Sequence, residues 1–127
     1  GLRYDSATGT TLILQWLEGR TDVGPGAHDR WQFEAAFILL AQQLGAHRLA
    51  VRLDDFSTQQ NQTIFPGPLG DERGDALTLG WTWAVREHLE IAAEWLEIRS
   101  RYNKRAALGE PASADERLLQ LALRWTL

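Results

Sequence analysis

Apolar and polar residues alternate along most of the chain, and this period of two residues restricts its fold more than any other feature. Between residues 76 and 86 the odd positions are apolar: Leu77, Leu79, Trp81, Trp83 and Val85. Successive side chains of a β-strand point to opposite faces of its sheet, so this alternation predicts a strand with one apolar face. The same pattern predicts further strands over residues 10–20, 31–43, 47–57, 89–101 and 117–127.

The connections that precede and separate these six predicted strands alternate in length. Residues 5–9, 43–47 and 87–88 form short connections, whereas residues 21–30, 57–75 and 102–116 form long ones. An up-and-down sheet places successive connections at opposite ends, so the short and the long connections separate. Outer-membrane barrels show this asymmetry, with short periplasmic turns and long extracellular loops. We therefore predict an all-β, antiparallel, up-and-down transmembrane β-barrel segment with about six full strands, whose C-terminus lies on the periplasmic side.

Tryptophan is concentrated at the odd positions of the predicted strands: Trp31, Trp81, Trp83, Trp95 and Trp125. Indole rings favour the interfaces of a bilayer, which predicts that these five side chains face lipid. Even positions mix small residues with charged ones, a combination that suits an aqueous lumen. The predicted pore-lining residues are Glu34, Arg48, Arg52, Arg86, Glu90, Glu94 and Arg124.

The arginines of the predicted lumen allow two interpretations. Fixed guanidinium groups along a pore wall would guide anionic solutes such as phosphate or carboxylates. Alternatively, the arginines pair with acids on neighbouring strands and only fill the wall. The long connection over residues 57–75 is similarly open, because it suits either a constriction inside the pore or a cover over the outer rim.

Composition excludes several other classes of protein. The net charge is −4, from 13 basic and 17 acidic residues without a basic run, so nucleic acid is a poor partner. The richest apolar run, residues 35–41, is far shorter than the roughly 20 residues of a membrane-spanning helix. The absence of cysteine excludes disulfides and thiolate metal sites.

No group of residues predicts catalysis or a metal site. The three histidines lie in predicted connections, without a partner at metal-ligand spacing: His28, His47 and His88. The nearest catalytic candidates are also unconnected in the sequence: His28, Asp54, Asp55 and Ser57. We expect a passive channel without a cofactor, which contacts membrane lipid and small hydrophilic solutes or ions.

Several short stretches, taken in order, carry a further signal: Asp55-Phe56-Ser57, Ala76-Leu77-Thr78-Leu79-Gly80-Trp81, Glu87-His88-Leu89-Glu90-Ile91-Ala92-Ala93-Glu94-Trp95-Leu96, Arg99-Ser100 and Leu119-Gln120-Leu121-Ala122-Leu123-Arg124-Trp125. Together they resemble the C-terminal end of porin-like proteobacterial proteins, which are distantly similar to phosphate-selective porins. The resemblance covers nearly the whole chain. It implies a larger barrel, a signal peptide and a location in the bacterial outer membrane.

A soluble α+β domain of unknown binding function is the alternative. Residues 31–45 can be drawn as a helix that ends at Gly45, and Ser113 with Glu116 has the form of a capping box before a second helix. That second helix would carry large apolar residues around much of its circumference, which disfavours it.

Six strands are too few for the smallest closed outer-membrane barrels, which have eight. An open sheet edge in lipid would leave backbone groups without hydrogen-bond partners. We therefore expect that Gly1 is a processing or artificial boundary, or that other copies of the chain complete the sheet.

Overall fold

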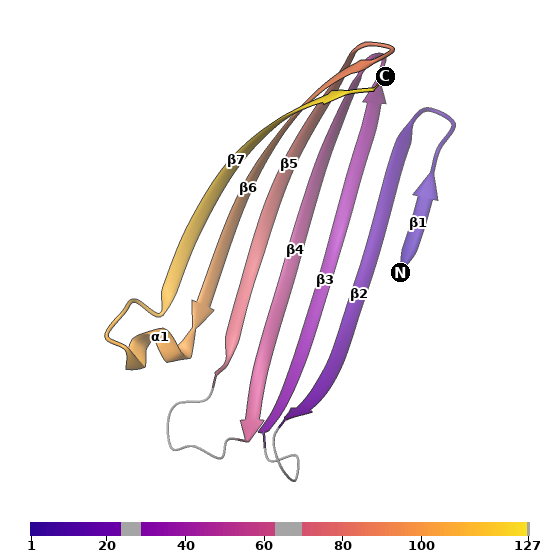
Figure 1. Cartoon of the computed structure of the whole chain (residues 1–127). Coiled ribbons are helices and arrows are strands. Elements are labelled where there is room, and N and C mark those ends of the chain that lie inside the picture. Colours follow the sequence, from indigo (N-terminus) through magenta and orange to yellow (C-terminus); the bar gives the residue numbers. More distant parts are fainter. Residues whose placement is uncertain (24–28, 63–69, 127) are drawn as a thin grey trace.

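The computed structural model describes residues 1–23, 29–62 and 70–126, and most of these residues belong to one antiparallel sheet. The strands are β1 (Leu2–Asp5), β2 (Thr10–Val23), β3 (Asp29–Leu44), β4 (His47–Gln62), β5 (Glu72–Arg86), β6 (Leu89–Tyr102) and β7 (Ser113–Trp125). Their order in the sheet is their order in the chain, so each strand pairs with its neighbours in sequence (Figure 1). The prediction of an all-β, up-and-down fold is confirmed.

All six predicted strands are present, and each extends further toward the long connections than we expected. The sequence did not predict the short strand β1 or the helix α1 (Asn103–Ala107), which lies between β6 and β7. The helices of the α+β alternative are wrong, because residues 31–44 and 113–125 are strands. In the part of the chain that the structure describes, no helix has the length and apolar character needed to cross a membrane.

The short connections follow β1, β3 and β5 and lie at one end of the sheet, which we call the short-turn end. Two of these turns contain glycine with a positive φ, +81° at Gly9 and +60° at Gly45. This backbone conformation is costly for residues with a Cβ atom, so glycine allows the chain to reverse within a few residues. We call the opposite end the long-loop end.

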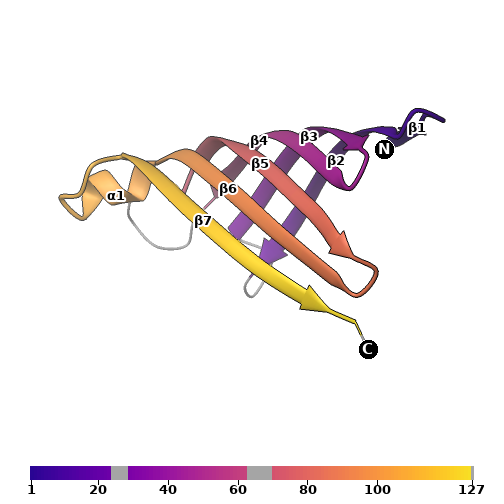
Figure 2. The ribbon, with the colours of Figure 1, turned by 90° about the horizontal axis from the view of Figure 1, so that it is seen from above.

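The sheet is bent and twisted but not closed (Figures 1 and 2). Within the described residues, β1 and β7 each pair on one side only and form the two edges. The sheet also lacks an apolar core: Ala41, 2% exposed, is the only buried hydrophobic residue in the described part of the chain. Most large apolar side chains therefore lie on a surface.

The pairing register assigns every strand residue to one of two faces, because directly opposed residues point to the same side. One face contains a row that crosses all seven strands: Tyr4, Leu12, Leu40, Val51, Leu79, Trp95 and Leu119. We call it the leucine-rich face. The other, the mixed face, contains charged, small and aromatic residues, among them Phe37, Arg52, Gly80, Glu94 and Gln120.

The faces switch between odd and even numbering at one hairpin. Leu44 pairs with His47 across a two-residue turn, so even positions of β3 share a face with odd positions of β4. In every other pair of strands, odd positions lie opposite odd positions and even positions opposite even ones. The β5–β6 hairpin achieves this through a bulge between Ala84 and Arg86. The turn length of a single hairpin therefore decides which face β3 presents.

Two aromatic rings cover glycines on the mixed face. Phe33 lies opposite Gly19, and Phe56 lies opposite Gly74. A Cβ atom at Gly74 would be 2.5 Å from Phe56 Cζ and 2.5 Å from the carbonyl oxygen of Arg99, and one at Gly19 would collide with the Phe33 ring. Glycine at these two positions lets the ring of the neighbouring strand approach the backbone closely.

We predict that Gly74→Ala destabilises the sheet by about 1–3 kcal/mol, because the added methyl group overpacks the contact with Phe56. Gly80 is the matched control, since it lies on the same face of the same strand and a Cβ there would only touch Ala50 Cβ at 3.6 Å. Gly80→Ala should stay within about 0.5 kcal/mol of wild type. The midpoint of urea unfolding measures both, and equal midpoints would contradict the prediction.

Candidate membrane-facing and pore-facing surfaces

The leucine-rich face carries a continuous apolar band. Each long strand contributes side chains to it: Leu12, Leu14 and Trp16 on β2, Ile38 and Leu40 on β3, Leu49, Val51 and Leu53 on β4, Leu77, Leu79, Trp81 and Trp83 on β5, Leu89, Ile91, Ala93 and Trp95 on β6, and Leu119, Leu121, Leu123 and Trp125 on β7. Several are strongly exposed, with Leu121 at 76% and Leu123 at 70%. Soluble monomers rarely expose an apolar patch that crosses a whole sheet.

The apolar band ends abruptly at a charged edge on its long-loop side. Along each strand the same face changes from apolar to polar or charged within two residues, and the edge includes Glu18, Glu34, Asp55, Asp75, Glu97, Arg99, Asp115 and Arg117. Glu97 accepts a hydrogen bond from Arg99 at 2.8 Å and lies 3.6 Å from Arg117. The bond from Arg99, together with the charge of Arg117, lowers the pKa of Glu97 below its ordinary value.

An aromatic cluster borders the band at the short-turn end. The rings of His47, Trp81 and Trp83 stack with centroid distances of 5.6 to 6.3 Å. Trp81 Nε1 donates a hydrogen bond to His47 Nδ1 at 3.3 Å. His47 stands where the predicted connection 43–47 meets the predicted strand 47–57, and it is the first residue of β4. The cluster combines apolar rings with polar ring nitrogens, as residues at a boundary between hydrocarbon and water do.

The apolar band runs obliquely across the strands. On the short-turn side the band ends at Leu12 on β2 and at Trp125 on β7. A line of paired residues that starts at Leu12 and crosses the four intervening strands reaches β7 at Leu119, not at Trp125. Over five strand pairs the boundary is therefore displaced along the strands by the distance from Leu119 to Trp125. At about 3.3 Å per residue and about 4.8 Å between strands, this displacement corresponds to roughly 40°.

The opposite boundary of the band moves in the same direction. It lies at Trp16 on β2 and at Leu119 on β7, whereas the register connects Trp16 to Asp115. The displacement from Asp115 to Leu119 corresponds to roughly 30° on the same spacings. Both boundaries are therefore inclined to the perpendicular of the strands by a similar angle.

The mixed face places charges at the same height as the apolar band. Arg52 lies in sequence between Val51 and Leu53, and its guanidinium is 2.5 Å from Asp54 on the same strand. The Arg52 guanidinium carbon also lies 4.1 Å from the centroid of the Phe37 ring on β3. Arg52 is thus held by a carboxylate beside it and by an aromatic ring on the next strand.

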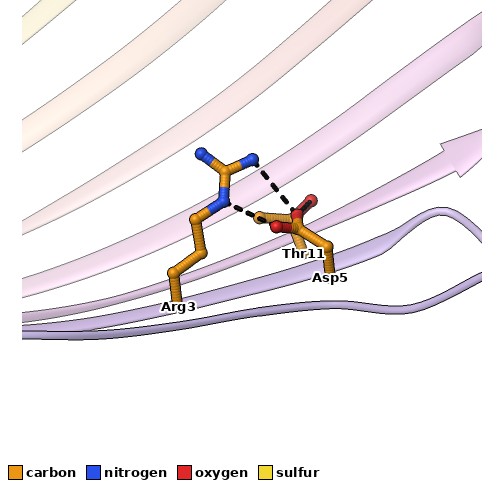
Figure 3. Close-up of polar contacts among 3 residues, drawn as sticks. All are labelled: Arg3, Asp5 and Thr11. Carbon is orange, nitrogen blue, oxygen red and sulfur yellow. Dashed lines mark hydrogen bonds and ion pairs between the residues drawn. The ribbon is translucent and has the colours of Figure 1, made fainter.

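The other charges of the mixed face are less closely paired. Glu90 and Arg124 lie directly opposite each other on β6 and β7. Among the described residues, neither Arg48 nor Arg124 forms an ion pair, although the charge of Arg48 acts on Asp5 from a greater distance. Asp5 is itself engaged by Arg3, whose Nε donates at 2.7 Å, and by the Thr11 hydroxyl at 2.9 Å (Figure 3).

The register brings most of the predicted site residues together, with two corrections. Arg48, Arg52, Glu90, Glu94 and Arg124 share the mixed face, and Trp81, Trp83, Trp95 and Trp125 share the leucine-rich face. Trp31 lies on the mixed face and Glu34 on the leucine-rich face, because the Leu44 to His47 turn exchanges the parity of β3. Arg86 pairs with Leu89 beyond the bulge and lines a surface hollow together with Glu90 and Arg124.

The residues weighed as catalytic candidates are separated by the sheet. Asp54 lies on the mixed face, whereas Asp55 and Ser57 lie on the leucine-rich face, and His28 falls outside the described residues. Within residues 1–23, 29–62 and 70–126, no three His, Asp or Glu side chains group closely enough to hold a metal ion.

Comparison of the chain with known protein families, with curated proteins and with solved structures gave no match. The assignment of a function therefore depends on the two faces of the sheet and on what lies at their ends.

We predict that the charged edge makes stability depend on pH through Glu97. A carboxyl group with a lowered pKa in the folded state stabilises that state above its ordinary pKa of about 4.3. This stabilisation is lost as the pH falls through the lower folded value. Glu97→Gln should show a smaller loss of stability than wild type between about pH 5 and pH 3, measured by unfolding in detergent. Identical pH profiles would contradict the prediction.

Proposed function

We propose that the chain is a segment of a bacterial outer-membrane β-barrel porin, a passive channel for small hydrophilic solutes or ions. In this proposal the leucine-rich face contacts lipid and the mixed face lines the aqueous lumen. The long-loop end lies outside the cell and the short-turn end in the periplasm. The chain then has no catalytic role of its own.

The observation that carries the proposal is the oblique apolar band on one face only. Strands of outer-membrane barrels are tilted by about 35–45° from the barrel axis, so a horizontal layer of lipid crosses neighbouring strands at steadily shifted heights. The inclination of roughly 30–40° estimated above from the strand spacings is close to that tilt. The charged edge and the ring cluster of His47, Trp81 and Trp83 then border the hydrocarbon at its two interfaces.

The mixed face supports the same orientation. Charged groups such as Arg52, Glu94 and Arg124 would be costly in hydrocarbon but are well solvated in a water-filled lumen. We further propose that β1 and β7 pair with additional strands, from the rest of a larger barrel or from other copies of the chain. Such pairing supplies partners for backbone groups that an open edge would leave unsatisfied in lipid.

The two proposed environments can be tested at adjacent alanines. Ala93 lies on the leucine-rich face between Trp81 and Leu121, and Ala92 lies on the mixed face between Thr82 and Ala122. We predict that Ala93→Arg costs about 2–4 kcal/mol of folding free energy in lipid, because it places a cation in hydrocarbon. Ala92→Arg should cost less than about 1 kcal/mol, because its side chain enters water.

Urea titration of the barrel in lipid vesicles measures both variants. Brominated lipid provides an independent measurement, since it should quench the fluorescence of tryptophans that contact acyl chains. Equal costs at Ala92 and Ala93, or folding into a stable soluble sheet without lipid or detergent, would overturn the membrane orientation.

Ion selectivity depends on the unpaired cations of the lumen. We predict that Arg48→Gln combined with Arg124→Gln shifts the reversal potential toward cation preference, since both variants remove a charge that forms no ion pair among the described residues. The pair Arg52→Gln with Asp54→Asn removes one charge of each sign and should shift it less. Planar-bilayer recordings of the assembled barrel measure the shift. An equal shift of the reversal potential in the two double variants would favour the interpretation in which the arginines only fill the wall.

A further inference from the structure

The helix α1 belongs to the connection between β6 and β7, but its side chains reach back over the mixed face. Arg105 Nη1 donates to Ser100 Oγ at 3.1 Å, and the Arg105 guanidinium lies 6.0 Å from the Tyr102 ring. Ser100 and Tyr102 occupy mixed-face positions of β6, opposite Gly74 and Glu72. These contacts place α1 on the side of the sheet that the proposed function assigns to the lumen.

Lys104 extends further and reaches β3. Its Nζ atom lies 5.7 Å from the centroid of the Trp31 ring, so one side chain of α1 passes the ends of β5 and β4. Among the described residues Lys104 forms no ion pair, and the aromatic ring is its neighbour instead. Trp31 lies on the mixed face, opposite Gln60.

Gly70 fills the space between these groups. A Cβ atom there would be 2.7 Å from Trp31 Cη2 and 3.2 Å from Lys104 Nζ. The Gly70 amide donates to Gln60 Oε1 at 2.9 Å, and Gln60 is 4% exposed, which is rare on this sheet. The Asn103 amide also donates to the Asp71 carbonyl at 3.1 Å. The start of α1 is therefore tied to the residues that precede β5.

We propose that α1, held by Lys104 and Trp31 across Gly70, forms the constriction of the pore at its long-loop end. This inference rests on the proposed channel function and adds where the passage is narrowest. A helix with its side chains is about 10 Å wide, which is a large obstruction in a barrel lumen. Lys104 and Trp31 are positioning residues, because they hold the obstruction over the mixed face.

The absence of cysteine in the chain allows a direct test by single-cysteine modification of the assembled barrel in planar bilayers. Lys104→Cys, treated with a bulky charged methanethiosulfonate, should lose roughly half or more of its single-channel conductance, because the added group enters the narrowest section. Ser113→Cys is the matched control. It lies at the same end of the sheet but on the leucine-rich face, opposite Arg101, and its modification should leave the conductance unchanged.

Release of the helix should have the opposite effect. Trp31→Ala and Lys104→Gln should each raise the single-channel conductance by roughly twofold, whereas Lys104→Arg preserves the cation over the ring and should retain the wild-type value. A purely structural role of Trp31 would lower the stability without this rescue pattern. Unchanged conductance in Trp31→Ala and in modified Lys104→Cys, with a conducting wild type, would overturn the constriction alone. A barrel that conducts in no variant would overturn the channel function, and the constriction with it.

Discussion

The hydrogen bonds between neighbouring strands are the interaction on which the rest of this structure depends. Six antiparallel pairings join seven strands, and the fold has almost no other source of cohesion, since Ala41 is the only buried hydrophobic residue that the described chain offers. A soluble sheet normally covers its apolar face with a second layer. Here the leucine-rich face has no such cover among the described residues, so its environment must supply the burial that the chain lacks.

The register that these hydrogen bonds set also decides which side chains act together. Strand β3 is apolar on both faces, with Phe37 and Leu39 on one and Ile38 and Leu40 on the other. Its alternation is therefore weak, and parity alone assigned it to the wrong face. The faces of β3 are exchanged because the turn between β3 and β4 has two residues, whereas the sequence suggested a connection of five residues. A one-residue difference in turn length moves a whole strand to the other face, which is why Trp31 and Glu34 were misplaced while the remaining strands were grouped correctly.

Other features differ in how strongly the sequence signals them. The six long strands were predictable because their alternation continues over many residues, whereas β1 has four residues and α1 has five, too few for a periodic pattern. The charged edge has a signal in the sequence: at alternate positions of a strand, Leu53 is followed by Asp55, Trp95 by Glu97, and Arg117 precedes Leu119. The contact between Lys104 and Trp31 had no signal in the sequence, because it joins residues that are distant in sequence and Lys104 lies on a connection without periodicity.

The strongest constraint on function is the polarity of adjacent residues in the middle of the strands. Val51, Arg52 and Leu53 follow one another in β4, and Gly80, Trp81 and Thr82 do so in β5, so the sheet is apolar on one side and polar on the other at the same height. A sheet inside a soluble core would bury the charges with the apolar residues, and a sheet in water would expose the leucines and tryptophans. A wall one strand thick between hydrocarbon and water satisfies both sets of side chains. The steady drift of the apolar band, about one residue per strand, agrees with the stagger of tilted strands in the proposed barrel, so the pattern that supports the proposed membrane orientation also supports the proposed curvature of the sheet.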